Sequence, residues 1–189
     1  MICRWIDRSI AYDGSQLSAH WILSETGIVG DALVGFRGPC KVRRDEIADL
    51  ADIDGPGIAA DDMVHFVWES FSDTGLMVGV HRQRLLSATA LEVLRAMRPD
   101  LSARRDGDDL FIGDGKLSIS IATVTPVSCL IHFAVNASHG GAPVRIAALS
   151  DLKVDARAFA ENLLAQVASE QASIAEARCK VRAKGEWAR

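Results

Sequence analysis

The sequence predicts an α+β fold, in which helices pack against a mixed, mainly antiparallel sheet. Two periodicities alternate along the chain: apolar residues at every second position, as in strands, and apolar residues three or four positions apart, as in helices. The strand-like segments near the middle follow one another with only short turns between them, which is typical of antiparallel hairpins. With 189 residues, of which 49% are hydrophobic, the chain is long enough to bury a core, and we expect residues 1–189 to form a single domain.

The central hairpins carry the clearest strand signals. Asp109–Ile112 is followed by a Gly-Asp-Gly turn, in which glycine accepts the positive φ that tight turns require. The chain returns over Lys116–Val124, where apolar residues alternate with small or polar residues. Pro126 ends this strand, and Val127–Val135 forms a third one, which carries His132.

The remaining segments alternate between strands and helices. Strands are predicted at Ile2–Ile6, Ala32–Phe36, Met77–Val80 and Val144–Ala148. Helices are predicted from Ser15 to about Leu23, over Asp45–Leu50, from Asp61 to about Phe71, over Gln83–Met97, and over Asp155–Ala177, the last being a long C-terminal helix (about 155–177). The helix from Asp61 is predicted because two acidic residues at its start would complement the helix dipole.

Composition excludes several classes of protein. A net charge of −4 gives no general attraction to nucleic acid or to anionic lipid. No apolar run approaches the roughly 20 residues that a membrane helix needs, and the N-terminus lacks the features of a signal peptide, so we expect a cytoplasmic protein that binds neither nucleic acid nor membrane. The four cysteines form no Cys-x-x-Cys pair and are expected to be reduced. Cys40 follows a Gly-Pro pair that predicts a loop, where its thiol can be exposed.

Several polar side chains on the central strands make a candidate wall for a ligand. Lys116 lies at the mouth of the predicted hairpin, and Ser118 and Ser120 follow it at every second position, so all three are expected on one face. Lys116 would hold a negative charge, and His132 on the next strand would give or accept a proton. The alternatives are a solvated hairpin lysine, hydroxyls that bond to neighbouring backbone, and a core histidine satisfied by a carbonyl group.

Arginines next to glycine or on a helix are candidates for anion recognition. Arg37 and Gly38 lie in a turn-like segment where a guanidinium group can bind an anion with two hydrogen bonds. Arg82, together with Arg84, can extend the same basic rim. A plain surface arginine is the competing interpretation at each position.

One pair of residues gives a weak case for a metal site. His65 and Glu69 are four residues apart, so on the helix predicted from Asp61 they would share a face. The His-Glu-x-x-His arrangement is missing, and two ligands do not make a metal site, so an exposed His–Glu pair is the favoured interpretation.

From about Leu85 to Val167, the order of motifs resembles the biotin and lipoate protein ligase superfamily. A core helix is followed by a strand with Asp109 and Leu110, a glycine turn, a strand that begins at Lys116, and a strand with His132. The resemblance implies the ligase fold, a role for Lys116 and Asp109 in binding an acyl-adenylate, and a pocket lined by the strand of His132. The Arg-Arg-x-x-Gly-Gly phosphate loop of the ligases and the Pro-Cys-Gly nucleophile of the octanoyltransferases have no counterpart in this chain. The missing thiol removes the covalent step of the octanoyltransferase mechanism.

Over nearly its full length, the chain is also similar to the uncharacterised domain-of-unknown-function 366 family. The matching segments are Tyr12-Asp13-Gly14-Ser15, His20-Trp21, Phe36-Arg37-Gly38-Pro39-Cys40, Asp61-Asp62-Met63-Val64-His65, Arg104-Arg105-Asp106-Gly107-Asp108-Asp109 and Lys116-Leu117-Ser118-Ile119-Ser120-Ile121-Ala122-Thr123-Val124. This resemblance implies a fold akin to the ligases and no particular reaction.

Two functional hypotheses follow from different classes of protein. The first is an enzyme of acyl-transferase or ligase type that transfers or activates a small metabolite carrying a carboxylate or phosphate, with a nucleotide or acyl-adenylate as its bound cofactor. The second is a non-catalytic binding protein that keeps the pocket without the phosphate loop and nucleophile. A metal-dependent hydrolase built on His65 and Glu69 is a distant third. The expected partner is a small molecule, and exposed strand edges also allow a homodimer.

Overall fold

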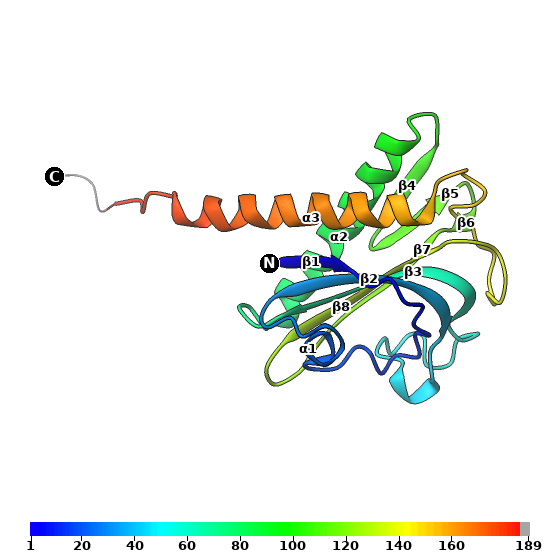
Figure 1. Cartoon of the computed structure of the whole chain (residues 1–189), viewed down its shortest axis with the longest axis horizontal. Coiled ribbons are helices and arrows are strands. Elements are labelled where there is room, and N and C mark those ends of the chain that lie inside the picture. Colours follow the sequence, from blue (N-terminus) through cyan, green and yellow to red (C-terminus); the bar gives the residue numbers. More distant parts are fainter. Residues whose placement is uncertain (186–189) are drawn as a thin grey trace.

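The computed structural model describes residues 1–185, and it confirms an α+β fold with a mainly antiparallel sheet (Figure 1). The main sheet has five strands in the order β1-β2-β3-β8-β7. Their bounds are Ile2–Trp5 for β1, Ala32–Lys41 for β2, Ala59–Ser70 for β3, Cys129–Asn136 for β8 and Ser118–Val124 for β7. Only the β1–β2 pair of this sheet is parallel.

A second, smaller sheet and the helices surround the main sheet. The small sheet joins β4 (Ala103–Asp106), β5 (Asp109–Ile112) and β6 (Gly115–Lys116). The helices are α1 (Trp21–Thr26), α2 (Leu76–Met97) and α3 (Ala156–Cys179), and a 3-10 turn, η1, covers Arg44–Glu46. No helix within the described residues is long and apolar enough to cross a membrane.

The two faces of the main sheet bury different cores. Helices α2 and α3 cover one face (Figure 1), where Phe66 and Phe133 are buried together with residues of both helices. The other face packs against α1 and the segment around Tyr12, where Phe36 and Val67 are buried. Strands β3 and β8 are therefore buried on both sides, and such strands become almost continuously apolar.

Two-sided burial explains why the predicted helix from Asp61 to Phe71 is wrong. The segment forms strand β3, and its residues Met63 to Ser70 are all buried. An apolar run of this length lacks the alternation that marks a half-buried strand, so periodicity does not distinguish it from a helix.

The predicted strand Met77–Val80 is also wrong, because these residues form the first turns of α2. Gly79 lies inside the helix at a place where a β-carbon would press against Sγ of Cys129. The glycine therefore permits close packing of α2 on the sheet rather than marking a strand end.

The other elements differ from the predictions mainly in their extent. The helix expected from Ser15 to about Leu23 begins only at Trp21 and continues to Thr26 as α1, and the one expected over Asp45–Leu50 is only the turn η1. The strand expected over Val144–Ala148 is a single bridge between Ile146 and Lys116. Strand Asp109–Ile112 has the predicted bounds, and the C-terminal helix is confirmed as Ala156–Cys179.

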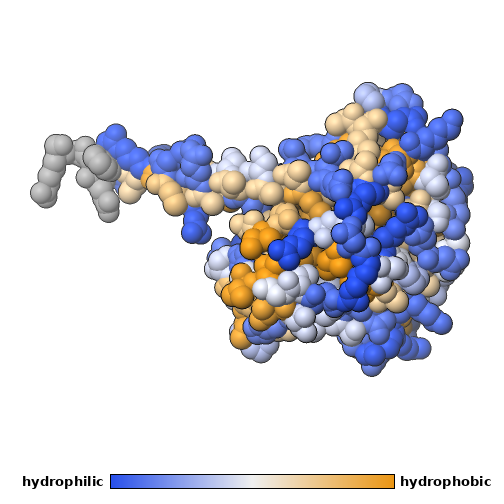
Figure 2. Space-filling view, in the orientation of Figure 1, coloured by the Kyte–Doolittle hydropathy of each residue, from blue (hydrophilic) through white to orange (hydrophobic). Residues whose placement is uncertain are grey.

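Helix α3 projects beyond the rest of the molecule at its C-terminal end (Figure 1). Its buried residues end at Val167, and the following turns are largely exposed, including Ile174. Apolar surface lies on the body of the molecule beneath this projecting part, while hydrophilic surface is more extensive toward the other end of the view (Figure 2). Strands β1 and β7 are the two edges of the main sheet.

The start of α3 depends on a side-chain cap. The carboxylate of Asp155 accepts a hydrogen bond from the backbone N–H of Ala158, at 2.7 Å. We expect Asp155→Ala to lower the free energy of unfolding by about 1 kcal/mol, because one N–H of the first turn loses its partner. Urea denaturation would measure the loss, and Asp155→Asn, which keeps the accepting oxygen, should lower stability much less. Equal losses in both variants would contradict a capping role.

Candidate functional site

A cavity of about 510 Å³ opens on the face of the main sheet opposite α2 and α3. Its floor includes Tyr12, Met63 and His132, and its walls come from the loop after β2, the small sheet, strand β7 and the loop before Ile146. The lining is mixed: apolar side chains such as Ile119 lie beside several carboxylates. A pocket of this size and composition suits a small molecule with an apolar body and a few polar groups.

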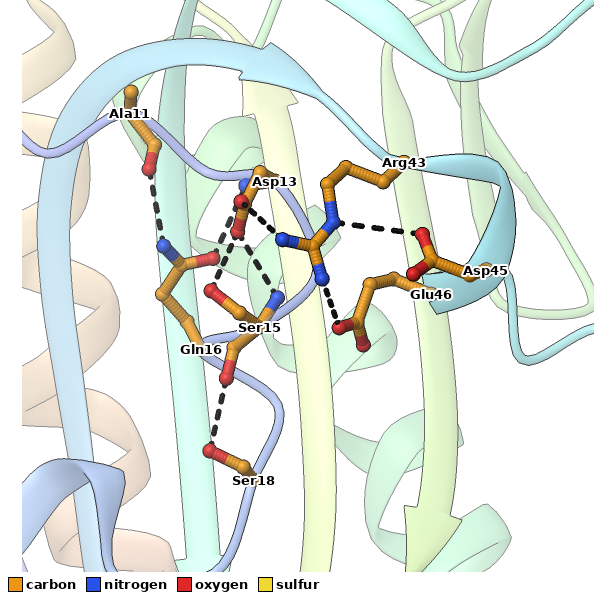
Figure 3. A network of polar contacts seen from close by, with 8 residues as sticks. All are labelled: Ala11, Asp13, Ser15, Gln16, Ser18, Arg43, Asp45 and Glu46. Carbon is orange, nitrogen blue, oxygen red and sulfur yellow. Dashed lines mark hydrogen bonds and ion pairs between the residues drawn. The ribbon is translucent and has the colours of Figure 1, made fainter.

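A network of polar contacts holds the floor of the cavity against its wall (Figure 3). The guanidinium group of Arg43 forms ion pairs with Asp13, Asp45 and Glu46, at 3.6, 3.4 and 2.7 Å. Asp13 directly follows Tyr12 in the floor, and Glu46 belongs to the cavity wall. Arg43 therefore ties together two segments of the cavity that are distant in sequence.

A pair of buried histidines includes His132, which lines the floor of the cavity, and His65, which contacts His132 but is not a lining residue. Nδ1 of His65 and Nε2 of His132 are 3.1 Å apart, and Nε2 of His65 lies 3.1 Å from the carbonyl oxygen of Gly38. The ring of Tyr12 stacks on His132, with centroids 3.7 Å apart and an angle of 8° between the planes. On the other side of the pair, Phe36 stacks on His65 at 5.0 Å.

Burial keeps both imidazoles uncharged. The pKa of His65 falls from 6.5 to about 4, chiefly because burial disfavours the charged form, while the carbonyl of Gly38 and the charge of Asp62 partly oppose the shift. Burial, and to a lesser degree the neighbouring His65, lowers the pKa of His132 well below its usual value. Near neutral pH, His132 therefore presents a neutral ring to the cavity.

Lys116 reaches the cavity from strand β6, where it forms an ion pair with Asp109. Its Nζ lies 2.8 Å from Oδ2 of Asp109, and its side chain is 33% exposed. Both residues belong to the cavity wall. Burial raises the pKa of the Asp109 carboxyl, although the hydrogen bond and the charge of Lys116 act in the opposite direction. The predicted site residues Lys116, Asp109 and His132 are thus brought to one cavity.

The expectation that Ser118 and Ser120 share a face with Lys116 is wrong, and the reason is a change of sheet. Lys116 belongs to the small sheet, whereas β7 in the main sheet begins at Ser118. In the β7–β8 register, Ser118 is opposite Val135 and Ser120 is opposite Phe133, which belong to the core beneath the helices. The alternation of side chains is therefore interrupted between the two strands.

The hydroxyl groups of these serines bond to the backbone. Oγ of Ser118 is fully buried and accepts a hydrogen bond from the N–H of Leu110 at 2.8 Å. Ser120 contributes to the cavity wall, but its hydroxyl donates to the carbonyl oxygen of His132 at 3.0 Å. Ser118 therefore joins the two sheets, and Ser120 fixes the strand that carries His132.

The structure does not bring Arg37 or Arg82 to the cavity. Arg37 is exposed on the helix-bearing face of β2 and binds both carboxylate oxygens of Asp62, each at 2.7 Å. Arg82 on α2 donates to Oγ of Ser70 and to the carbonyl oxygen of Asp73. Both guanidinium groups are therefore engaged by the protein's own residues, and Gly38 serves the site only through its carbonyl oxygen on His65.

Strand geometry also removes the weak metal site. His65 and Glu69 lie on the same face of β3, but four residues of a strand span about 13 Å, too far for one ion. The carboxylate of Glu69 instead accepts hydrogen bonds from the N–H of His20 and the hydroxyl of Ser128, at 2.7 and 2.9 Å. Within residues 1–185, no group of three or more His, Cys, Asp or Glu side chains is arranged to hold a metal ion.

Two features of the site were missed by sequence reasoning. Tyr12 lies in the cavity floor, and its segment bonds to the bulged end of β2 through the backbone of Pro39 and Lys41. The expectation of an exposed Cys40 is wrong, because its thiol is buried beside Tyr12 and burial raises its pKa to about 12. The partnership of His65 with His132 was not predicted, because each residue was placed on an unrelated element.

The fold belongs to the class of the biotin and lipoate protein ligases. A biotin protein ligase from Aquifex aeolicus, in complex with biotin and ATP, has a TM-score of 0.57 at 10% identity, covering 88% of this chain and 69% of that one. A bipartite lipoate protein ligase from Thermoplasma acidophilum has a TM-score of 0.55 at 15% identity, covering 89% and 82%. At these identities the similarity establishes the fold and not the reaction.

Closer similarities identify the family. A Pyrococcus horikoshi protein described as being of unknown function has a TM-score of 0.87 at 35% identity, covering 96% of this chain and 98% of that one. An uncharacterized protein of Methanocaldococcus jannaschii is 36% identical over 149 residues, which is 76% of this chain and 66%, or just under two thirds, of that protein. The chain belongs to the family described as domain of unknown function (DUF366), which matches residues 1–182.

Proposed function

We propose that the protein is a small-molecule transferase or ligase that binds a carboxylate-bearing metabolite in the cavity beside Lys116 and His132. The observation that carries this proposal is the placement of a cation and a neutral imidazole in the wall of one cavity of about 510 Å³. Apolar residues, among them Met63 and Ile119, would contact the body of the ligand. Lys116 would bind its negative charge, which is most effective where the surroundings exclude water.

The ion pair between Lys116 and Asp109 is compatible with anion binding. Asp109 has a raised pKa because it is partly buried, so protonation of its carboxyl costs less than for an exposed aspartate. An incoming carboxylate would replace Asp109 as the ion-pair partner of Lys116. The Asp109 carboxyl would then be protonated or would turn toward other hydrogen-bond donors. The nucleotide or acyl-adenylate expected from the ligase resemblance gains support from the fold shared with a ligase that binds biotin and ATP.

A second candidate is a binding protein without catalytic activity. The arginines of α2 that come nearest to the ligase phosphate loop in sequence are held elsewhere: Arg82 by Ser70 and Asp73, and Arg84 by Asp108 at 2.9 Å. A chain that lacks free arginines in this part of α2 would bind a nucleotide phosphate weakly.

We also propose that the chain forms a single domain, that the protein is cytoplasmic, and that exposed strand edges allow a homodimer.

Thermal unfolding with and without ligand tests the proposal. The probes are ATP, short-chain carboxylates and a non-hydrolysable acyl-adenylate mimic. A probe at a hundred times its dissociation constant adds about 2.7 kcal/mol, which is a shift of about 5–10 °C for a chain of this size. We expect Lys116→Ala to reduce the shift at a given probe concentration by at least half.

The matched control is Lys180→Ala, because Lys180 lies at the projecting end of α3, paired with Glu176. This variant should keep the full shift. Release of pyrophosphate from ATP in the presence of the bound carboxylate would support the enzyme, whereas binding without release would support the second candidate. If no probe changes the melting temperature, or if Lys116→Ala keeps the full shift, the proposed site is wrong.

A further inference from the structure

The histidine pair at the cavity floor fixes the position of its own protons. A carbonyl oxygen only accepts hydrogen bonds, so Nε2 of His65, 3.1 Å from the carbonyl oxygen of Gly38, must carry a hydrogen. In a neutral imidazole the other nitrogen is then an acceptor, which makes Nδ1 of His65 unprotonated. Nε2 of His132, 3.1 Å away, must therefore be the donor in the bond between the two rings.

The hydrogen bonds that join Gly38, His65 and His132 leave one ring nitrogen of His132 without a hydrogen-bond donor. With its hydrogen on Nε2, neutral His132 has a lone pair on Nδ1. No residue among 1–185 forms a hydrogen bond with this nitrogen. Only 3% of the surface of His132 is exposed, and His132 belongs to the cavity floor. Among the described residues, the fully buried side-chain nitrogen and oxygen atoms without a hydrogen-bond partner are Nε1 of Trp68 and Nη1 of Arg84, which is ion-paired with Asp108, and Nδ1 of His132 is not one of these enclosed atoms. Nδ1 of His132 is thus accessible from the cavity.

The surroundings of the pair hold both rings in place. Tyr12 stacks on His132 at 3.7 Å and on His65 at 5.3 Å, while Phe36 covers His65 at 5.0 Å. The phenol of Tyr12 stays uncharged, because burial raises its pKa far above the physiological range. Asp62 influences His65 through its charge but is bonded to Arg37 and Ser138. Aromatic contacts and one backbone carbonyl therefore determine the orientation of the rings.

We propose that Nδ1 of His132 accepts the hydrogen of an O–H or N–H group on the bound metabolite, and that His65 is the positioning residue that holds His132 in this tautomer. The inference rests on the proposed function, because it takes the cavity as the substrate site. In the reaction, the O–H or N–H bond of the metabolite breaks, its electron pair stays on the oxygen or nitrogen, and a new N–H bond forms at Nδ1. His65 stabilises the resulting imidazolium by accepting its Nε2–H.

Nitrogen NMR of histidine-labelled protein tests the tautomers without any ligand. Protonated and unprotonated ring nitrogens have well-separated shifts, and we expect unprotonated Nδ1 and protonated Nε2 in both His65 and His132 at neutral pH. In His65→Leu, His132 loses its acceptor and should show both tautomers. In His65→Asn, the side-chain oxygen can accept from Nε2 of His132 and should restore the single tautomer. A wild-type spectrum with the hydrogen on Nδ1 of His132 would overturn the inference, even if the variants failed to fold.

A pair of probes tests the acceptor role. Hexanoate and ω-hydroxyhexanoate share the carboxylate and differ by one hydroxyl group. We expect the hydroxy acid to bind about tenfold more tightly, as one hydrogen bond allows, and to shift the Nδ1 resonance of His132. In His132→Phe the ratio of the two affinities should fall to about one, whatever the absolute affinity of this variant for hexanoate. Equal affinity of both acids for the wild type, with the predicted tautomers present, would overturn the acceptor role but not the proposed function. Failure of both acids to bind would instead count against the proposed function.

Discussion

Replacing Gly38 by alanine is expected to lower the free energy of unfolding by about 3 kcal/mol, at the upper end of the usual cost of overpacking. A β-carbon at this position would overlap the carbonyl oxygen of Ile10 and lie 2.7 Å from its carbonyl carbon. Backbone atoms cannot rotate away as a side chain does, so strand β2 and the segment before Tyr12 would have to separate. The two are joined there by the hydrogen bonds from Ile10 N–H to Arg37 and from Tyr12 N–H to Pro39, at 3.1 and 2.8 Å.

The same substitution should also affect the cavity. The carbonyl of Gly38 accepts the hydrogen bond of His65, and Tyr12 forms part of the cavity floor. Urea denaturation gives the loss of stability, and the probe-induced thermal shift gives the effect on the cavity. The matched control is Gly75→Ala, because nothing lies within 4 Å of a β-carbon there, and it should cost about 0.5 kcal/mol as a helix N-cap. Similar losses at both positions would show that the close approach to Ile10 does not determine the effect.

Local sequence patterns predicted the elements that are bounded by a turn, a proline or a helix cap. Strand Asp109–Ile112 lies next to a glycine turn, and α3 has a capping aspartate and a clear apolar face, so both were predicted close to their observed bounds. Strand β3 was mistaken for a helix because both of its faces are buried. The apolar run then carries no period, and only the neighbouring strands β2 and β8 establish that it is extended.

The candidate site was predicted in part for the same reason. Lys116 and His132 were predicted as site residues because they are polar groups on adjacent hairpin strands, and because those strands resemble the ligases. Asp109 was predicted from the ligase resemblance alone, and all three residues line the cavity. The partnership of His65 with His132 depends on strands β3 and β8, which lie side by side although 67 positions separate the two histidines. A contact over such a distance has no local signal. Arg37 was predicted to bind a ligand because its true partner, Asp62, could not be recognised from the sequence. The two residues are 25 positions apart, and their ion pair also has no local signal.

Acidification from about pH 7 to about pH 5 is expected to lower the free energy of unfolding by about 2–4 kcal/mol through the buried histidine pair. In the folded protein the pKa of His65 is about 4, and that of His132 also lies well below the ordinary value of 6.5. Below about pH 6.5, the unfolded chain therefore binds protons that the folded protein does not bind, so stability falls as the pH falls. Each histidine contributes about 1.4 kcal/mol per pH unit until its folded pKa is reached.

The carboxyl groups change the stability in a different pH range from the histidines, or they change it in the opposite direction. The lowered pKa values of residues such as Asp31 and Asp62 give stability that is lost only below their unfolded pKa near 3.8. Asp109 has a raised pKa, so its protonation in acid favours the folded state and partly offsets the loss. Urea denaturation at both pH values measures the net slope.

Variants separate the histidine contribution from that of the carboxyl groups. A double variant, His65→Gln with His132→Gln, should lose most of the slope because it retains every carboxyl group but neither imidazole. His81→Gln is the matched control, since His81 lies exposed on α2, and it should keep the wild-type slope. If the double variant retained the full slope, the two imidazoles would not be the neutral, buried pair on which the acceptor role of His132 depends.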